Sequence, residues 1–115
     1  MNKANNVITG NSGEDLACGY LKRNGYKILD RNYRNDIGEI DIIAKYKGVI
    51  VFVEVKCRTS DYFGMPKEAV GLYKQNKIRK VALGYLKHKR LGEPAIRFDV
   101  IEVLGGEINH IENCF

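Results

Sequence analysis

The sequence predicts a single α/β domain, in which a mixed β-sheet is flanked by α-helices in the order α-β-β-β-α-β-β. Two neighbouring runs rich in β-branched residues, 39–44 and 49–56, predict adjacent strands. A later segment, 73–89, repeats its apolar residues at helical spacing. The chain has 115 residues, the length of one domain, and can bury a core without disulfide or metal support. We expect the folded domain to span 12–115.

The N-terminal part predicts a helix and then a short strand. Residues 1–11 are polar and are expected to form a flexible N-terminus. Ser12 provides a helix N-cap signal, and Gly25 is placed to end the helix. Residues 26–29 predict a short strand, and 30–35 a polar, basic connection. The inward face of the helix is expected to carry Leu16, Ala17, Tyr20 and Leu21.

Lys47 and Gly48 separate the two clearest strands and suit a tight hairpin turn. The run 49–56 is apolar on both faces, which predicts a central strand that is covered on each side. Residues 58–64 read as a loop, and Pro66 can open a short helical turn.

The rest of the chain predicts a helix and two strands. The second strand, over 108–111, is expected at an edge of the sheet, after a strand over 95–104. The helix over 73–89 should bury one apolar stripe, formed by Ile78, Val81, Ala82, Tyr85 and Leu86.

The predicted hairpin brings charged residues together on one face of the sheet. A two-residue turn sets a register that places Asp41 directly opposite Glu54. The same register places Glu39 opposite Lys56, and alternation puts all four side chains on one face. The same face also carries Ile43, so it is not simply a solvated surface.

Two carboxylates so close together need a compensating positive charge. At a separation of about 4 Å they repel by roughly 4 kcal/mol at an effective dielectric near 20. A divalent cation with a preference for oxygen ligands, Mg²⁺ or Mn²⁺, would offset this repulsion and could polarise a phosphoryl oxygen. Lys56 could orient the attacking water or stabilise charge on the phosphate. In the plainer reading the group is a charged sheet face, with Glu39 paired to Lys56.

The distribution of positive charge points to an anionic partner. The net charge is +5, which favours nucleic acid, with DNA expected in preference to RNA. Arg34 and Arg58 flank the carboxylate hairpin and could guide a phosphate backbone to it. A solvated basic face or an acidic protein partner are the alternatives. The helical segment has no acidic residue and carries Lys74, Lys77, Arg79, Lys80, Lys87, Lys89 and Arg90.

Other signals exclude several functional classes. Residues 1–10 lack the apolar stretch of a signal peptide, and no run is long enough to span a membrane, so we expect a cytoplasmic protein without membrane contact. The three cysteines form no C-x-x-C pair, which argues against a zinc site or a disulfide framework. Asp99 is expected to pair with Arg97 or with another nearby basic residue, and His110 to lie at the surface.

Several strings in the sequence resemble one family. Residues 38–44 (GEIDIIA) and 53–58 (VEVKCR) are similar to the YraN family of small bacterial proteins. The pieces at 13–14 (GE), 31–34 (RNYR) and 97–100 (RFDV) extend this resemblance over nearly the whole chain.

Asp41 followed by Glu54-Val55-Lys56 resembles the D…(D/E)-x-K signature of the restriction-endonuclease-like nuclease superfamily. The resemblance implies a nuclease-type sheet flanked by helices, similar to Holliday-junction resolvases, and an endonuclease for branched or structured DNA. It implies that Asp41 and Glu54 bind Mg²⁺ or Mn²⁺ with a third contact from the Val55 carbonyl. It also makes Lys56 the catalytic lysine. Many superfamily members have proline before the aspartate, where this chain has Ile40.

The resemblance to the superfamily also implies roles for two further residues. Glu14 matches the helix glutamate that resolvase-like members bring towards the metal, although a first-turn glutamate also complements the helix dipole. Gln75 lies where related nucleases place a polar helix residue, and it is grouped with the nucleic-acid-binding residues. A resolvase-like function would favour a homodimer, because a junction needs two symmetric cuts. A non-catalytic nucleic-acid-binding module with the nuclease fold is the alternative.

Overall fold

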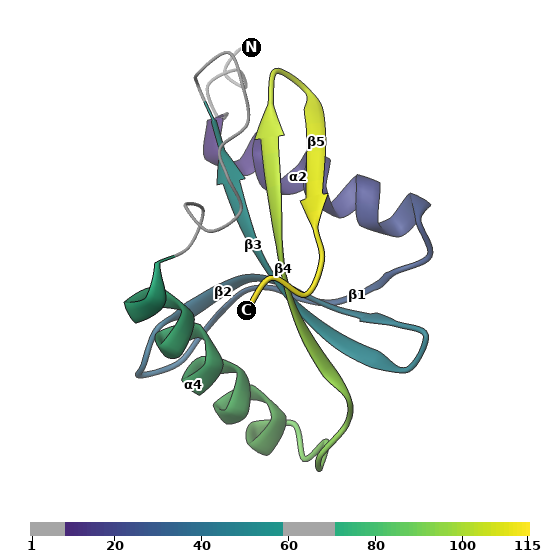
Figure 1. Ribbon diagram of the computed structural model, residues 1–115. Coiled ribbons are helices and arrows are strands. Elements are labelled where there is room, and N and C mark those ends of the chain that lie inside the picture. Colours follow the sequence, from purple (N-terminus) through teal and green to yellow (C-terminus); the bar gives the residue numbers. More distant parts are fainter. Residues whose placement is uncertain (1–8, 59–70) are drawn as a thin grey trace.

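The computed structural model describes residues 9–58 and 71–115, and within the first range it describes side chains from residue 13 onward. The order α-β-β-β-α-β-β is the predicted one (Figure 1). The predicted turn at Pro66 and most of the predicted loop lie outside the described residues. The elements are α2 (Thr9–Arg23), β1 (Lys27–Arg34), β2 (Glu39–Tyr46), β3 (Val49–Cys57), α4 (Leu72–His88), β4 (Ile96–Leu104) and β5 (Glu107–Ile111).

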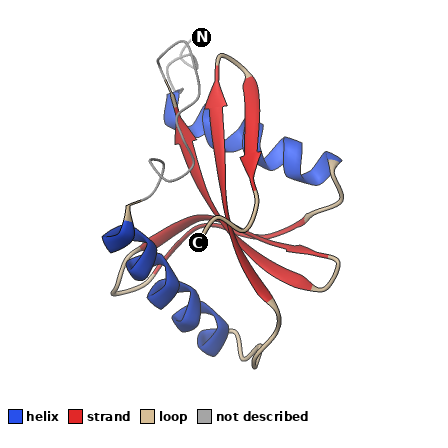
Figure 2. Ribbon diagram, viewed as in Figure 1, coloured by secondary structure: helices blue, strands red, loops and turns tan. Residues whose placement is uncertain are grey.

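The five strands form one mixed sheet in the order β1-β2-β3-β4-β5 (Figure 2). Neighbouring strands run antiparallel except for β3 and β4, which are parallel and are connected through α4. The central position of β3 and the edge position of β5 confirm the predictions. Pairing on both sides satisfies the backbone of β3, the most apolar strand, and both of its faces are covered.

The two helices cover opposite faces of the sheet. Phe52 of β3 packs in the cluster that contains α4, whereas its neighbours Val51 and Val53 pack in the cluster that contains α2. All five apolar residues predicted for the stripe of α4 are buried. On α2 the prediction was wrong for Leu16, which is 43% exposed, because Cys18 takes the inward position instead.

Turn chemistry fixes the ends of these elements. Lys47 and Gly48 both have positive φ, as a type I′ hairpin turn requires, so the predicted hairpin is confirmed. Gly25 also has positive φ and ends α2 as predicted, with its N–H bonded to the carbonyl of Lys22. The N–H of Tyr26 bonds to the carbonyl of Leu21, which completes a Schellman motif.

Two predicted boundaries are wrong. The first helix begins at Thr9, three residues before the predicted N-cap at Ser12. The first strand does not stop at Leu29 but continues to Arg34, because the polar segment pairs with β2 as an edge strand and can leave its outer side chains in solvent. The register shifts between Ile28 and Asp30. Neither described helix is long and apolar enough to cross a membrane.

Candidate functional site: a carboxylate pair at the fork of two strands

The candidate site lies where β2 and β3 separate. Their ladder follows the predicted register as far as Ile42 and Val53 and ends there, while β3 continues beside β4 (Figure 1). Asp41 Oδ2 accepts a hydrogen bond of 2.8 Å from the backbone N–H of Val55. The pairing of β2 and β3 therefore ends one residue pair before Asp41 and Glu54, which were predicted to lie directly opposite each other. The Asp41 carboxylate connects the two strands there instead.

Asp41 and Glu54 line the same cavity, which has a volume of about 420 Å³. Its walls come from β2, β3, the turn at 35–38 and one side of α4. The charged side chains that line this cavity besides the pair include Arg34, Glu39, Lys74 and Lys77. The structure thus combines a carboxylate pair from the sheet with basic residues from α4 and β1.

The turn at 35–38 is held in place against α4. Asn35 Oδ1 accepts hydrogen bonds from the backbone N–H groups of Ile37 and Gly38. A Cβ atom at Gly84 would lie 2.8 Å from Asn35 Nδ2, so glycine at this position of α4 lets the turn approach closely. This contact fixes one wall of the cavity relative to the helix that carries its lysines.

The two acids differ in their electrostatic surroundings. Burial, together with the negative charge of Glu54, raises the pKa of Asp41 to about 7, and the hydrogen bond from the backbone N–H of Val55 opposes this shift. Glu54 is 7% exposed and forms an ion pair of 2.6 Å between its Oε2 and Lys74 Nζ. Burial lowers the pKa of Lys74, but the hydrogen bond and charge of Glu54 outweigh it and raise that pKa.

Lys74 has a partner that the sequence did not predict, while its predicted contact to nucleic acid stays a prediction. Its position in the basic helix suggested a contact to nucleic acid, whereas the structure brings its ammonium group directly to Glu54. Lys56 is partly buried, lies on the same face of β3 as Glu54, and is not among the described residues that line the cavity. Its predicted catalytic role stays a prediction.

The other charged residues of the hairpin have partners of their own. Glu39 pairs with Arg34 at 2.6 Å, so the preferred pairing of Glu39 with Lys56 was wrong. Arg58 donates two hydrogen bonds, of 2.7 and 3.0 Å, to Glu102 on β4, whose side chain is fully buried. The guanidinium of Arg58 is therefore held by an internal carboxylate, while Arg34 lines the cavity.

Glu14 lies on α2 and is not among the described residues that line the cavity of the carboxylate pair. Its Oε1 is buried without a hydrogen-bond partner, and Arg31 lies 3.5 Å from it. Its charge raises the pKa of Asp41 only as a minor contribution. Across residues 13–58 and 71–115 no three His, Cys, Asp or Glu side chains are grouped closely enough to hold an ion. Metal binding by Glu14 or by the Val55 carbonyl thus stays a prediction.

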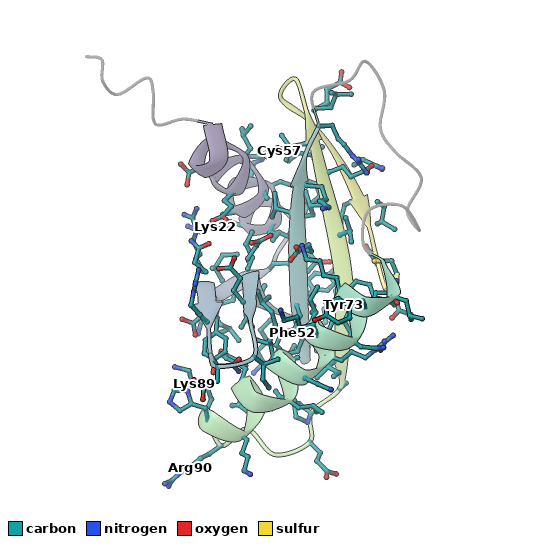
Figure 3. All side chains as sticks on the ribbon, turned by 90° about the vertical axis from the view of Figure 1, so that its left-hand side faces the viewer. Lys22, Phe52, Cys57, Tyr73, Lys89 and Arg90 are labelled. Atoms are coloured by element: carbon teal, nitrogen blue, oxygen red, sulfur yellow. The ribbon has the colours of Figure 1, made fainter. Side chains whose placement is uncertain are left out.

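The first turns of α4 carry the remaining predicted contact residues. Gln75 is partly buried, and its backbone N–H bonds to the carbonyl of Gly71. Lys77 Nζ lies 5.9 Å from the centre of the Tyr73 ring, which is 80% exposed. Figure 3 shows Tyr73 on this end of α4, with Lys89 and Arg90 at the opposite end. The exposed face of the helix thus carries basic residues along its length, beside the exposed apolar side chains of Leu72, Tyr73 and Leu83.

The donor chemistry of the pair fits a divalent cation. Carboxylate oxygens are the ligands that Mg²⁺ and Mn²⁺ prefer, and both acids face one cavity. The half-exposed ammonium of Lys74 pairs with Glu54, and the raised pKa of the partly buried Asp41 shows that a negative charge there lacks full compensation. Asp41 and Glu54 are therefore the residues that would hold such an ion.

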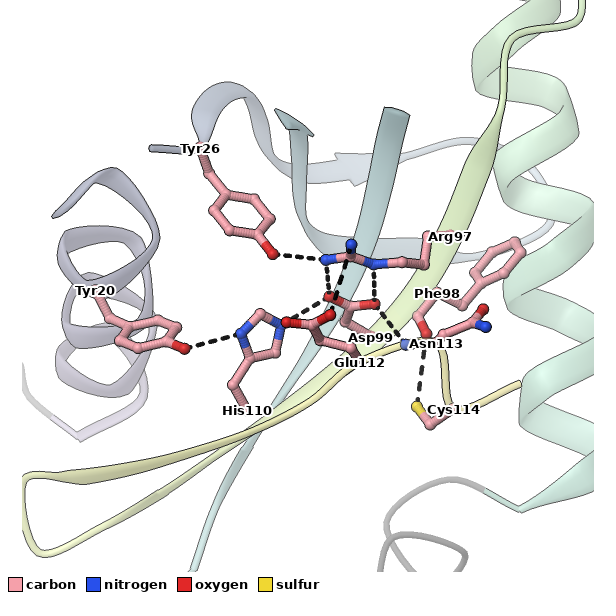
Figure 4. Close-up of polar contacts among 9 residues, drawn as sticks. All are labelled: Tyr20, Tyr26, Arg97, Phe98, Asp99, His110, Glu112, Asn113 and Cys114. Carbon is pink, nitrogen blue, oxygen red and sulfur yellow. Dashed lines mark hydrogen bonds and ion pairs between the residues drawn. The ribbon is translucent and has the colours of Figure 1, made fainter. Parts of the chain in front are cut away.

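A second group of ionisable residues lies on the α2 face, around Asp99 (Figure 4). Asp99 is fully buried and accepts hydrogen bonds from Arg97, His110 and the backbone N–H of Asn113. The pairing with Arg97 is confirmed, but the prediction of a surface role for His110 was wrong, since its side chain is 6% exposed and also bonds to Tyr20. With both carboxylate oxygens bonded, this network joins β4, β5 and α2 and has a structural role.

Comparison with known proteins places the chain in a family. A relative from Caldanaerobacter subterraneus subsp. tengcongensis is 49% identical over 122 aligned positions that cover 100% of both chains. Relatives from Alkaliphilus oremlandii and Clostridioides difficile are 55% and 51% identical, each covering 96% of this chain and 99% of the relative. All three carry the name UPF0102 protein. The model of "Uncharacterised protein family UPF0102" matches residues 13–103, so this chain belongs to the UPF0102, or YraN, family that its motifs resemble.

Proposed function

We propose that this protein is a Mg²⁺- or Mn²⁺-dependent nuclease that hydrolyses phosphodiester bonds in DNA, including branched or structured DNA. The observation that carries the proposal is the pair of acids, Asp41 and Glu54, lining one cavity with basic side chains. The resemblance of Asp41 and Glu54-Val55-Lys56 to the nuclease signature supports the same reaction.

The chain's own residues would divide the work in this reaction. The bound cation supplies the positive charge that polarises the phosphoryl oxygen and lowers the pKa of the attacking water. Asp41 and Glu54 would hold it, and the hydrogen bond from the backbone N–H of Val55 restricts the orientation of Asp41. Lys77 and Arg34, which line the cavity, would bind phosphate oxygens. Lys56 would orient the water or stabilise the developing charge.

The direct experiment is a cleavage panel with purified protein. It would offer linear duplex, single-stranded and branched DNA, together with RNA, in Mg²⁺, in Mn²⁺ and in EDTA. We expect cleavage of DNA that requires the divalent ion. Cleavage that persists in EDTA, or no cleavage of any substrate with either ion, would contradict the proposed activity.

Divalent ions should stabilise the folded protein. An ion that binds only the folded state contributes RT ln(1 + [L]/Kd), or about 2.7 kcal/mol at a concentration of 100 times Kd. For a domain of this size that corresponds to an increase in Tm of about 10 °C. Thermal denaturation with and without Mn²⁺ measures it. The double variant Asp41→Asn/Glu54→Gln is the control, and an equal increase in that variant would place the ion elsewhere.

Binding to DNA should depend on salt through the lysines of α4. Lys77→Ala is expected to weaken binding to every duplex sequence and to reduce the slope of log K against log[salt] by about 1. Fluorescence anisotropy across a salt series measures this slope. Lys22→Ala provides a matched control, because it removes the same charge from the exposed end of α2 on the other face of the sheet (Figure 3). A similar loss in both variants would indicate only an effect of net charge.

One observation favours a non-catalytic nucleic-acid-binding module as the second candidate. The 2.6 Å ion pair with Lys74 neutralises Glu54 from within the chain, as in a site that has lost its cation. This candidate predicts salt-sensitive DNA binding that is the same in EDTA and in Mg²⁺, without cleavage.

A further inference from the structure

We propose that Lys74 is a displaceable counter-ion that couples cation binding at the carboxylate pair to DNA binding in the same cavity. This inference rests on the proposed function, because it assigns a positioning role to a residue of that site. Lys74 Nζ lies 2.6 Å from Glu54 Oε2, one of the two oxygens through which Glu54 can hold a cation. The ammonium and the cation therefore compete for one ligand atom.

The burial of the two partners shows which one can move. The Glu54 side chain is 9% exposed and is fixed in the central strand, whereas the Lys74 side chain is 47% exposed. Lysine carries its charge on a flexible four-carbon stem, so the ammonium can leave Glu54 while its backbone stays in place. The backbone of Lys74 is anchored one turn away by Ile78, which is buried against the sheet.

Cation binding changes the net charge of the site, and this change favours an anionic partner for the ammonium group of Lys74. With both acids ionised, Asp41, Glu54 and Lys74 together carry one net negative charge, and a divalent cation changes this sum to one net positive charge. The displaced ammonium then lies in a cavity that Lys77 and Arg34 also line. A phosphate oxygen is the anion that suits this position. Lys74 thereby makes the cavity attractive to DNA only when the cation is bound.

This coupling is reciprocal. A ligand that favours one of two states also favours every other ligand that binds that state. DNA phosphate that holds Lys74 away from Glu54 therefore frees the carboxylate oxygen, and it should strengthen cation binding by the same factor by which the cation strengthens DNA binding. Lys77 lies on the same helix and lines the same cavity. Its ammonium group, however, lies over the ring of Tyr73 and does not occupy Glu54 Oε2.

The test measures Mn²⁺ affinity by titration calorimetry on wild type, Lys74→Gln and Lys77→Gln, without DNA. We expect Lys74→Gln to bind Mn²⁺ about threefold to tenfold more tightly, since its competitor is gone. Lys77→Gln removes a charge from the same cavity without freeing the ligand oxygen, so it should tighten Mn²⁺ binding by a smaller factor than Lys74→Gln, and an equal gain in both variants would contradict the inference. Weaker or unchanged Mn²⁺ binding by Lys74→Gln would overturn the inference.

A second measurement tests the coupling itself. The affinity for a short phosphorothioate DNA duplex, which resists cleavage, is measured with and without Mn²⁺. Wild type and Lys77→Gln should bind the duplex more tightly with Mn²⁺, and Lys74→Gln should lose most of that gain. If Asp41→Asn abolishes Mn²⁺ binding but Lys74→Gln retains the full gain, only the coupling is refuted. If wild type and Lys74→Gln both fail to bind Mn²⁺, the proposed function fails and the coupling fails with it.

Discussion

The substitution Asp41→Asn should reduce metal-dependent DNA cleavage by at least about 100-fold while leaving the fold intact. The amide oxygen of asparagine can still accept the hydrogen bond from the N–H of Val55, so the tie between β2 and β3 is retained. The substitution removes one of the two charged ligands of the proposed ion. Initial cleavage rates of a DNA substrate in Mg²⁺, with circular dichroism as the check on folding, measure the effect.

A matched variant distinguishes the loss of a metal ligand from the loss of any negative charge in the cavity. Glu39→Gln also removes a carboxylate that lines the cavity, but Glu39 is half exposed and pairs with Arg34. We expect its cleavage rate to stay within about threefold of wild type, since exposed ion pairs contribute little. Full activity in Asp41→Asn, or an equal loss in Glu39→Gln, would remove Asp41 from the proposed ligand set.

Asp99→Asn should cause the largest loss of stability. Asp99 is fully buried, and it holds Arg97 and His110 through charge-assisted hydrogen bonds of 2.7 to 2.9 Å. Removing one partner of a buried pair leaves the other charge without compensation, at a cost of about 3–5 kcal/mol. For a domain of this size the Tm should fall by about 12–20 °C.

Asp15→Asn is the control for this loss of stability. Asp15 also pairs with an arginine, at 2.9 Å from Arg31, but its side chain is 65% exposed. An exposed pair contributes no more than about 1 kcal/mol, so its Tm should change by only a few degrees. Thermal denaturation of the two variants at pH 7 makes the comparison, and similar Tm values would show that the Asp99 network does not stabilise the fold.

The stability that Asp99 contributes should depend on pH in a defined direction. Burial raises the pKa of Asp99, but the hydrogen bonds from its donors outweigh burial and hold the pKa below its ordinary value of 3.8. A lowered pKa means that the stabilisation is complete above about pH 4 and is lost as the pH falls towards the folded-state pKa. The Tm difference between wild type and Asp99→Asn should therefore be smaller at pH 3 than at pH 7. A constant difference would contradict this assignment.

Local patterns were sufficient for most of the fold. The register of the hairpin follows from the Lys47-Gly48 turn, and the buried stripe of α4 follows from its helical period. Both depend on residues close together in the chain. The first strand was predicted too short because its outer face is solvated, and polar residues on an edge strand resemble a loop in sequence.

The details of the candidate site depend on contacts that spacing does not encode. The fork at Asp41 arises because β2 separates from β3, while β3 stays paired as far as Cys57 with β4, a strand from the other end of the chain. The approach of Lys74 to Glu54 depends on where α4 crosses the sheet, and the bond between Arg58 and Glu102 depends on the β3–β4 register. Residue types therefore identified the acids, but only their packing identified the partners of those acids.

The hydrogen bond between Asp41 and the amide of Val55 makes one backbone proton a spectroscopic reporter of the site. In most sheets an amide proton is bonded to a backbone carbonyl of the adjacent strand, which does not change when a side chain binds a ligand. Here the acceptor is itself a proposed ligand, so any molecule that withdraws electron density from that carboxylate also alters the Val55 amide resonance. A single nitrogen–proton cross-peak can thus follow occupancy of the cavity directly, without relying on turnover.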